Sequence, residues 1–154
     1  MLALYTPKYE DLWFRQQMLE DEETMSYNRA WGGTIPFPEA SWRAWYDHWI
    51  ADHENRRFYR YLQRADGMFV GEAAYHFDGE TGWWLADVIV HARFRGKGCG
   101  GRGLELLCAA AKANGVAVLY DDLAAGNPAF TMFLKHGFAE VCRTEDKIIL
   151  RKVL

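Results

Sequence analysis

The chain has 154 residues, of which 50% are hydrophobic and 25% are charged, and this suits one globular domain with a buried core. Its formal net charge of -3 at pH 7 leaves too little positive surface to neutralise a run of nucleic-acid phosphates. No apolar run approaches the roughly 20 residues that cross a bilayer, and no basic-then-apolar leader is present. We therefore expect one cytoplasmic domain over residues 1–154, with neither nucleic acid nor membrane as a partner.

The first third of the chain predicts a short strand and two helices. Residues 2–5 form the strand, and Thr6 and Pro7 can cap and begin a helix that runs to about Leu19. A turn-rich segment follows, after which residues 41–51 predict a second helix. Four aromatic residues repeat at i, i+3, i+4 and i+7 on this helix, and we expect them to pack against the core: Trp42, Trp45, Tyr46 and Trp49.

The middle of the chain predicts an antiparallel meander. Three strands are expected over residues 58–63, 68–77 and 82–90, because β-branched and aromatic residues dominate these runs. Asp-Gly pairs at 66–67 and 78–79 separate the runs and are typical of hairpin turns.

Strands and helices alternate in the second half. A helix that begins near residue 100 has one apolar face and ends at Asn114 and Gly115, as a left-handed cap prefers. The elements expected after it are a strand over 116–120, a helix from Pro128 to Gly137, and strands over 138–143 and 147–153. The whole pattern predicts an α/β chain with a mixed sheet.

Cysteine and histidine patterns predict neither a disulfide framework nor a metal site. The cysteines, Cys99, Cys108 and Cys142, are odd in number and far apart, and they form no C-x-x-C pair. The five histidines lack the spacing of metal ligands.

Residues 95–100, with the sequence Arg-Gly-Lys-Gly-Cys-Gly, lie between an apolar strand and a helix. Glycines let backbone N–H groups approach an anion, and the helix N-terminus directs its free donors to the same point. Four basic residues gather here, with no acidic residue between Asp87 and Glu105: Arg93, Arg95, Lys97 and Arg102. A basic run alone is equally typical of a solvated face. Together with the glycines, it predicts a ligand that carries phosphate.

One alternative is a dinucleotide-binding turn. Residues 96–101 fit that fingerprint, and Asp121 and Asp122 follow at the distance of a ribose-binding acid. The dinucleotide fold has several further units after this turn, however, and only 33 residues follow Asp121. Residues 91–95 also separate the strand from the first glycine, where that turn is normally tight. We therefore set this reading aside.

Residues 90–100 resemble the acyl-CoA loop of the GNAT superfamily of N-acetyltransferases, whose core pattern is Arg/Gln-x-x-Gly-x-Gly/Ala. A second block, from Asn127 through Phe133 and Lys135 to Phe138, resembles the Asn-x-x-Ala and Tyr-x-Lys-x-Gly-Phe segment of that superfamily. The resemblance implies a mostly antiparallel central sheet of six to seven strands flanked by about four helices. It also implies transfer of an acetyl group from acetyl-CoA to a primary amine, by direct attack in a ternary complex and without a metal.

The resemblance further implies how acetyl-CoA is held. The strand before the loop would receive the pantetheine arm on its exposed backbone, and the loop amides would bind the pyrophosphate with Arg95 and Lys97 as charge partners. The implied acetyl-CoA contacts are Val88, Ile89, Val90, Arg95, Gly96, Lys97, Gly98, Cys99, Gly100, Asn127, Phe133 and Lys135. Asn127 has an alternative role as a helix cap, because the second block is one residue shorter than the family pattern.

Three ionisable residues on the expected meander are candidates for the general base: Glu72, His76 and Asp87. Glu72 and His76 share a strand face but stand roughly 13 Å apart, so at most one of them acts. We expect Glu72 first, because Val70 and Ala74 beside it indicate a partly buried carboxylate. Asp87 lies nearest to the cofactor segment in sequence. For each residue the alternative is an exposed or structurally paired side chain.

The position of the family's general-acid tyrosine is occupied by Phe133, which has no proton to donate. Water, or Tyr120 from the neighbouring strand, is then the expected source of the thiolate's proton. The same substitution leaves open a non-catalytic acyl-CoA-binding or sensor domain.

In the family, the acceptor slot lies between the first two helices and the hairpin, which here implies Tyr27, Asn28 and Trp31. Aromatic walls with nearby acids would suit a cationic amine of a small molecule or a peptide. Ordinary packing is the alternative. Domains of this kind often form homodimers, but no residue here indicates the oligomeric state.

Overall fold

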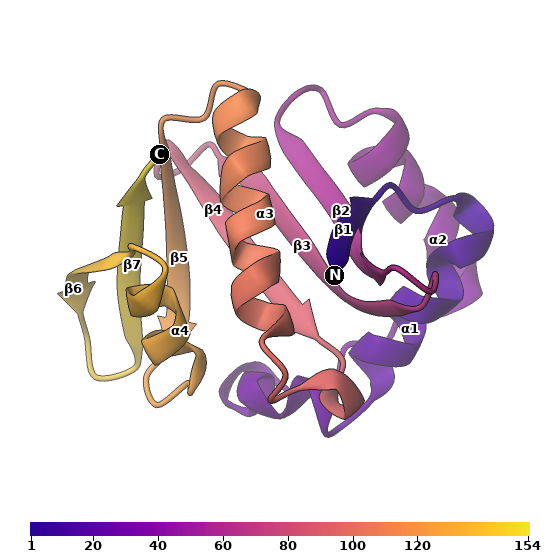
Figure 1. Ribbon diagram of the computed structural model, residues 1–154, viewed down its shortest axis with the longest axis horizontal. Coiled ribbons are helices and arrows are strands. Elements are labelled where there is room, and N and C mark those ends of the chain that lie inside the picture. The colour runs from indigo at the N-terminus through magenta and orange to yellow at the C-terminus, as the bar shows by residue number, and fades with distance from the viewer.

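The computed structural model describes residues 1–154 and contains one seven-stranded sheet in the order β1-β2-β3-β4-β5-β7-β6 (Figure 1). Its strands are β1 (Leu2–Tyr5), β2 (Arg57–Arg64), β3 (Phe69–Asp78), β4 (Trp83–Val90), β5 (Val118–Ala124), β6 (Ala139–Arg143) and β7 (Lys147–Val153). All neighbouring pairs are antiparallel except β4 and β5, which run parallel. The expected α/β fold is confirmed, with a sheet that is mixed because of this one pairing.

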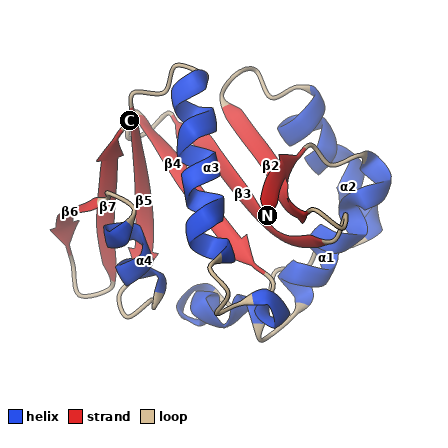
Figure 2. Ribbon diagram, viewed as in Figure 1, coloured by secondary structure: helices blue, strands red, loops and turns tan.

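Helices cover both faces of the sheet (Figure 2). The α-helices are α1 (Leu12–Glu20), α2 (Glu39–Tyr46), α3 (Cys99–Ala113) and α4 (Ala129–Lys135). Apolar residues of α3, such as Leu104 and Leu107, are fully buried against one face. Residues of α1, such as Leu12 and Met18, are buried with Tyr59 and other residues of a second core cluster. The sheet therefore separates two hydrophobic cores.

The aromatic residues of α2 pack as expected. Trp42, Trp45, Tyr46 and Trp49 are all half-buried against the second core cluster. The helix is shorter than predicted, because α2 ends at Tyr46 and one π-helical turn continues it from Asp47 to Ala51.

Three other segments differ from the sequence expectation. The first helix was expected to begin at Pro7, but α1 begins at Leu12, after a 3-10 turn over Tyr9–Asp11. The turn-rich segment contains a 3-10 helix, η2 (Thr24–Trp31). Asp21 stabilises its start by accepting hydrogen bonds from the backbone N–H and the hydroxyl of Thr24. Strand β5 continues to Ala124, although residues 116–120 alone were expected. It extends past two acidic residues because all seven of its residues pair with β7.

The parallel pairing of β4 and β5 is short. Only Trp84 with Leu119 and Leu85 with Tyr120 are in register, and beyond these pairs the two strands separate. The β5-facing backbone edge of residues 87–90 therefore has no strand partner, although β3 pairs with the other edge. Because backbone N–H and C=O groups require partners, this opening positions a binding site at the carboxyl ends of both strands.

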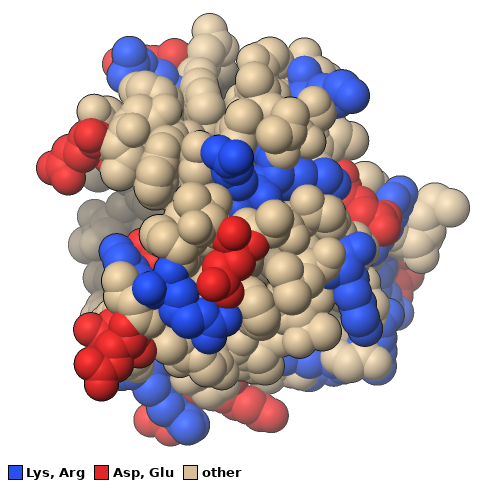
Figure 3. All heavy atoms as spheres, turned by 90° about the vertical axis from the view of Figure 1, so that its left-hand side faces the viewer, with Lys and Arg blue, Asp and Glu red and all other residues tan.

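The surface carries charges of both signs. On the side seen in Figure 3, Lys and Arg side chains are interspersed with Asp and Glu, and no continuous basic area forms. All three cysteines are free thiols. No helix combines the length and the apolar character that crossing a membrane requires.

Candidate active site

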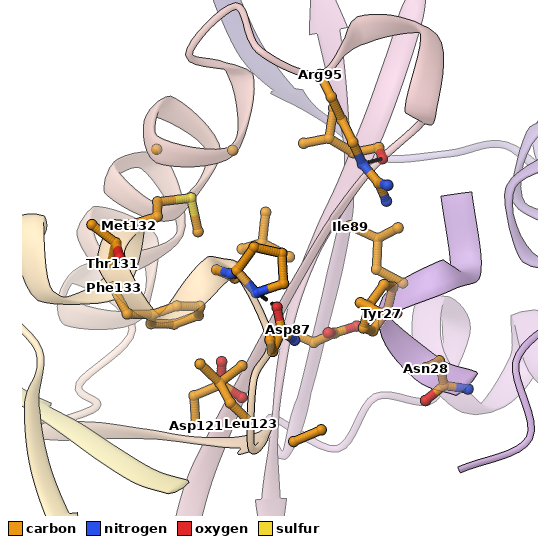
Figure 4. A pocket seen from close by; sticks show the side chains of 18 of the residues that line it. Tyr27, Asn28, Asp87, Ile89, Arg95, Asp121, Leu123, Thr131, Met132 and Phe133 are labelled. Atoms are coloured by element: carbon orange, nitrogen blue, oxygen red, sulfur yellow. Dashed lines mark hydrogen bonds between the residues drawn. The ribbon is translucent and has the colours of Figure 1, made fainter. Parts of the chain in front are cut away.

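The gap between the separated ends of β4 and β5 opens into a cleft of about 1130 Å³ (Figure 4). One wall is formed by α4 and the start of α3, and the opposite wall is formed by η2. The expected pantetheine strand lies in this cleft, since Val88, Ile89 and Val90 all line it. Segments about 100 residues apart in sequence, from Ser26 to His136, thus meet around one cavity.

The glycine loop adopts a conformation that other residues rarely reach. Gly96 and Gly98 have φ angles of 75° and 82°, in the left-handed region where a side chain is unfavourable. Gly98 is the N-cap of α3, so the first N–H groups of this fifteen-residue helix point toward the cleft without helical partners. Gly100 is needed for packing, because a Cβ atom there would lie 2.9 Å from Sδ of Met132 on α4.

Arg95 lies at the cleft but is occupied by backbone groups. Its guanidinium donates to the carbonyls of Val90, at 3.1 Å, and of Glu23 and Thr24. The Thr24 hydroxyl in turn accepts the N–H of Ala92 at 3.0 Å. We call this set of bonds the Thr24 clamp; it fastens η2 to the cofactor-side loop.

The other expected basic contacts differ among themselves. Lys97 is exposed outside the residues that line the cleft. Arg102 lines it and pairs with Glu105 at 3.0 Å. Lys135 lines it from the end of α4. The positive charge around the loop is therefore spread along the rim, and backbone donors dominate its inner surface.

Glu72 is buried outside the cleft, with 2% of its surface exposed. Its carboxylate accepts a hydrogen bond from Arg15 Nη1 at 2.8 Å and another from the hydroxyl of Tyr59. The guanidinium of Arg15 also lies 4.4 Å from the ring centroid of Trp45. Glu72 is thus the anionic member of a buried ion pair.

Two further candidates also lie outside the cleft. His76 packs edge-on against Trp49, with ring centroids 5.9 Å apart, and burial lowers its pKa. Tyr120 stacks on Trp83, with centroids 4.3 Å apart. Neither side chain is brought to the site where β4 and β5 separate.

Asp87 lies on β4 in the cleft and has no hydrogen-bonding partner for its carboxyl (Figure 4). Asp87 is exposed to the open cleft, and its pKa is raised to about 7, first by the hydration that the surrounding walls remove and then by the negative charge of Glu72, while Arg15 opposes the shift. Because the carboxyl still faces the cleft, a ligand that fills the cleft will remove more of its water.

Asp121 is a second carboxyl in the cleft, and sequence reasoning about catalysis missed it. It lies on β5, is 8% exposed, and accepts the N–H of Asp122 at 2.8 Å. Burial raises its pKa well above the ordinary value, and the charge of Asp87 raises it further. The available signal was an acidic pair inside a segment whose neighbours, Leu119 and Leu123, are apolar.

The second block forms the wall opposite η2. Phe133 is 2% exposed, lines the cleft and packs edge-on against Phe138, with centroids 5.0 Å apart. Asn127 also lines the cleft, and its Oδ1 accepts the N–H of Ala129 at 2.9 Å. Its alternative role as a cap of α4 is therefore present, while its Nδ2 has no partner within the chain.

The expected acceptor residues lie together on η2. Tyr27, Asn28 and Trp31 all line the cleft, and Figure 4 shows Tyr27 and Asn28 on the side opposite Met132 and Phe133 of α4. The amide of Asn28 donates to the Gly33 carbonyl at 2.8 Å, and Trp31 is half exposed at the mouth. Burial raises the pKa of Tyr27, with a further contribution from Asp87, so its hydroxyl stays protonated at neutral pH.

The sequence of residues 8–138 matches the model of the acetyltransferase (GNAT) family. The chain belongs to this family. A search of curated proteins found no sequence match. The glycine loop, the separated strands and the second block, which together line the cleft, all fall within the matched range.

Solved GNAT structures share the fold at low sequence identity. A phosphinothricin acetyltransferase from Sinorhizobium meliloti, in complex with acetyl-CoA, has a TM-score of 0.77 at 16% identity, covering 99% of this chain and 88% of that one. A ribosomal-protein-alanine N-acetyltransferase from Brucella melitensis has a TM-score of 0.76 at 21% identity, with coverages of 100% and 99%. An N-acetyltransferase from Staphylococcus aureus Mu50 has a TM-score of 0.76 at 20% identity, with coverages of 99% and 98%.

Proposed function

We propose that this GNAT protein transfers the acetyl group of acetyl-CoA to the primary amine of a small molecule or peptide, by direct attack in a ternary complex. The observation that carries the proposal is the single cleft that joins the glycine loop to the η2 wall, with Asp87 between them. Such a cleft has room for both substrates at once. Holding both reactants in one site replaces a bimolecular encounter and lowers the entropic part of the barrier.

The cofactor side of the cleft has the donors that acetyl-CoA needs. The backbone amides of residues 95–100 and the N-terminus of α3 suit a diphosphate, because they combine free N–H groups with the positive end of the helix dipole. The unpaired edge of residues 87–90 suits the amides of a pantetheine arm. A backbone N–H on the same edge is placed to polarise a thioester carbonyl.

We assign the general base to Asp87. An amine must lose a proton to complete its attack, and a base is most effective when its pKa lies near the working pH, as that of Asp87 does. Glu72, the first expectation from the sequence, is held by Arg15 and lies outside the cleft. We give Glu72 a supporting role, since its charge is one cause of the raised pKa of Asp87.

The acceptor side suits a cationic amine. Tyr27 and Trp31 provide aromatic surface, and Asp87 provides a negative charge below them. The names of structural neighbours are compatible with this class, since one refers to phosphinothricin and another to the alanine of a ribosomal protein. Both substrates carry a primary amine.

The test is an initial-rate assay of thiol release with acetyl-CoA and a panel of amines. A ternary complex predicts intersecting lines in double-reciprocal plots. Parallel lines would instead indicate an acetylated enzyme, with Cys99 as the thiol in the cleft. The Cys99→Ala variant is the control, and it should keep the wild-type rate within about threefold.

Phe133 favours one other function, a non-catalytic acyl-CoA-binding or sensor domain, because the usual proton donor is missing. Calorimetry separates the two functions. Tight acetyl-CoA binding without thiol release for any amine would support the sensor.

A further inference from the structure

Breakdown of the tetrahedral intermediate leaves a thiolate that must gain a proton. The residues first considered as its source cannot donate one at this place. Phe133 has no acidic proton, and Tyr120 is stacked on Trp83 outside the cleft. The cleft does, however, contain a second carboxyl that the assignment of the base leaves unused, that of Asp121.

The position of Asp121 follows from the topology. The last β4–β5 register pair is Leu85 with Tyr120, so Asp121 is the first β5 residue beyond it, at the base of the opening. In Figure 4, Asp121 lies below Phe133, while Asp87 lies across from it on β4. One side-chain oxygen accepts the N–H of Asp122, and no ion pair involves Asp121. The other oxygen is therefore available to a ligand in the cleft.

We propose that Asp121 is the general acid that protonates the departing thiolate, taking the part of the tyrosine that Phe133 replaces. This proposal rests on the proposed acetyl transfer. It gives the two cleft carboxyls opposite duties, with Asp87 ionised as the base and Asp121 neutral as the acid.

The protons balance over one turnover. A cationic amine first loses one proton to water and becomes a neutral nucleophile. Its nitrogen then forms a bond to the carbonyl carbon, and the second proton passes to the Asp87 carboxylate. The carbon–sulfur bond then breaks, its electron pair goes to sulfur, and the proton of the Asp121 carboxylic acid goes to the thiolate. Asp87 now holds a proton and Asp121 lacks one. Transfer of that proton from Asp87 to Asp121 through water restores both groups, so no proton is consumed.

The surroundings of Asp121 favour its neutral form. Asp87 faces it from β4, Asp122 adjoins it on β5, and both raise its pKa beyond the effect of burial, while the N–H of Asp122 opposes the shift. From η2 it faces Tyr27, and its β7 partner is the apolar Leu150. The basic groups nearest to Asp121 do not pair with its carboxyl.

Those basic groups are accounted for individually. Lys147 pairs with Asp122 at 3.4 Å, while Lys135 and His136 line the cleft from the end of α4. Neither α4 group pairs with Asp121. Asp121 thus has no cationic partner to favour its ionised form, as the acid of a pair of carboxyls requires.

The decisive variant is Asp121→Asn, which keeps the shape but cannot release a proton. We expect kcat to fall about 100-fold or more, with acetyl-CoA affinity unchanged within threefold by calorimetry. The wild-type kcat should decline at high pH as the acid ionises, and the variant should lack that decline. Adding Phe133→Tyr to Asp121→Asn should recover at least tenfold of kcat, because it restores a donor at the family position.

The control is Glu145→Gln, which makes the same change from carboxyl to amide at an exposed residue outside the cleft and should change kcat by less than about threefold. A measurement that needs no turnover accompanies the kinetics. Infrared difference spectra of wild type against Asp121→Asn should reveal a protonated carboxyl stretch at pH 7.

The outcomes distinguish the two proposals. Absence of thiol release by the wild type with every amine would refute the acetyl transfer and this role with it. Wild-type kcat in Asp121→Asn would refute the acid alone and leave the acetyl transfer standing. A difference spectrum without the protonated carboxyl at pH 7 would overturn the assignment even if kcat fell in Asp121→Asn.

Discussion

Glu72 and Asp87 belong to adjacent strands. The side chain of Asp87 is open to the cleft, whereas that of Glu72 is buried outside it. In the register of β3 and β4, Glu72 lies opposite Ile89 and Asp87 opposite Ala74. Arg15 from α1 forms an ion pair with Glu72 and none with Asp87. The two carboxyl groups therefore differ in their expected roles, because only Glu72 has a cationic partner.

Asp87→Asn tests the base. We expect kcat to fall by about 10²–10⁴-fold, because an amide cannot take the amine's proton, while acetyl-CoA affinity stays the same. In the wild type, the carboxylate is the active form, so kcat should rise as pH increases and level off above a midpoint near 7. Rate–pH profiles check both points. A wild-type profile in Asp87→Asn would remove Asp87 from the mechanism.

Glu72→Gln tests the buried pair. Arg15 would keep its charge without an anionic partner, with only 16% of its side chain exposed, so we expect a loss of about 3 kcal/mol in unfolding free energy. Urea denaturation measures it. Adding Arg15→Met should recover part of the loss, since the unpaired charge is removed. A 100-fold loss of kcat at unchanged stability would return Glu72 to the role of base.

Among the structural elements, η2 matters most for coupling the two halves of the site. It carries Tyr27 and Trp31 on the acceptor wall, and its first residue, Thr24, is fully buried in the Thr24 clamp. The clamp joins η2 to Arg95 and Ala92, just before the glycine loop. Because these bonds fasten η2 to the start of the glycine loop, we expect the two segments to hold their positions relative to each other.

Thr24→Val tests this coupling. The valine has a similar shape but cannot accept the Ala92 N–H, so we expect a loss of about 1–3 kcal/mol in stability. The KM values of both substrates should rise together, with a smaller change in kcat. Steady-state kinetics with both substrates varied provide the measurement. Thr24→Ser keeps the hydroxyl and should behave like the wild type; equal defects in both variants would contradict the clamp.

The single sheet consists of two parts that are joined by a short strand pairing. Strands β1 to β4 and strands β5 to β7 are joined through only two β4–β5 register pairs, together with contacts of α3 and α4. A ligand in the opening would contact both halves and supply partners for the unpaired edge of β4. Binding should therefore stabilise the protein across the division as well as at the loop.

Acetyl-CoA at about 100 times its Kd should raise the unfolding free energy by about 2.7 kcal/mol. Hydrogen exchange should slow at residues 87–90 of β4, where free N–H groups gain partners. A small acetyl thioester without the nucleotide is the control. Because it lacks the diphosphate, it should protect neither residues 87–90 nor the glycine loop at residues 95–100. Protection confined to residues 95–100 would contradict a ligand that extends along β4.

Much of this site could be predicted from local sequence. The glycine loop and the strand and helix that flank it depend on residues close to one another in the chain. The same reason explains why β7 and the order of the elements could be predicted. The boundary of β5 was wrong, because its pairing with β7 carries it past two acidic residues that local propensity treats as an end.

The sequence by itself determined the family, the glycine loop and the absence of a tyrosine at residue 133, since each depends on residue types at short spacings. Only the tertiary structure decided which carboxyls face the cleft. Arg15 reaches Glu72 across 57 positions, and Asp87 and Asp121 meet across the opening of the sheet. Ionisation depends on burial and on neighbouring charges, and both are created by contacts between segments that are distant in the chain.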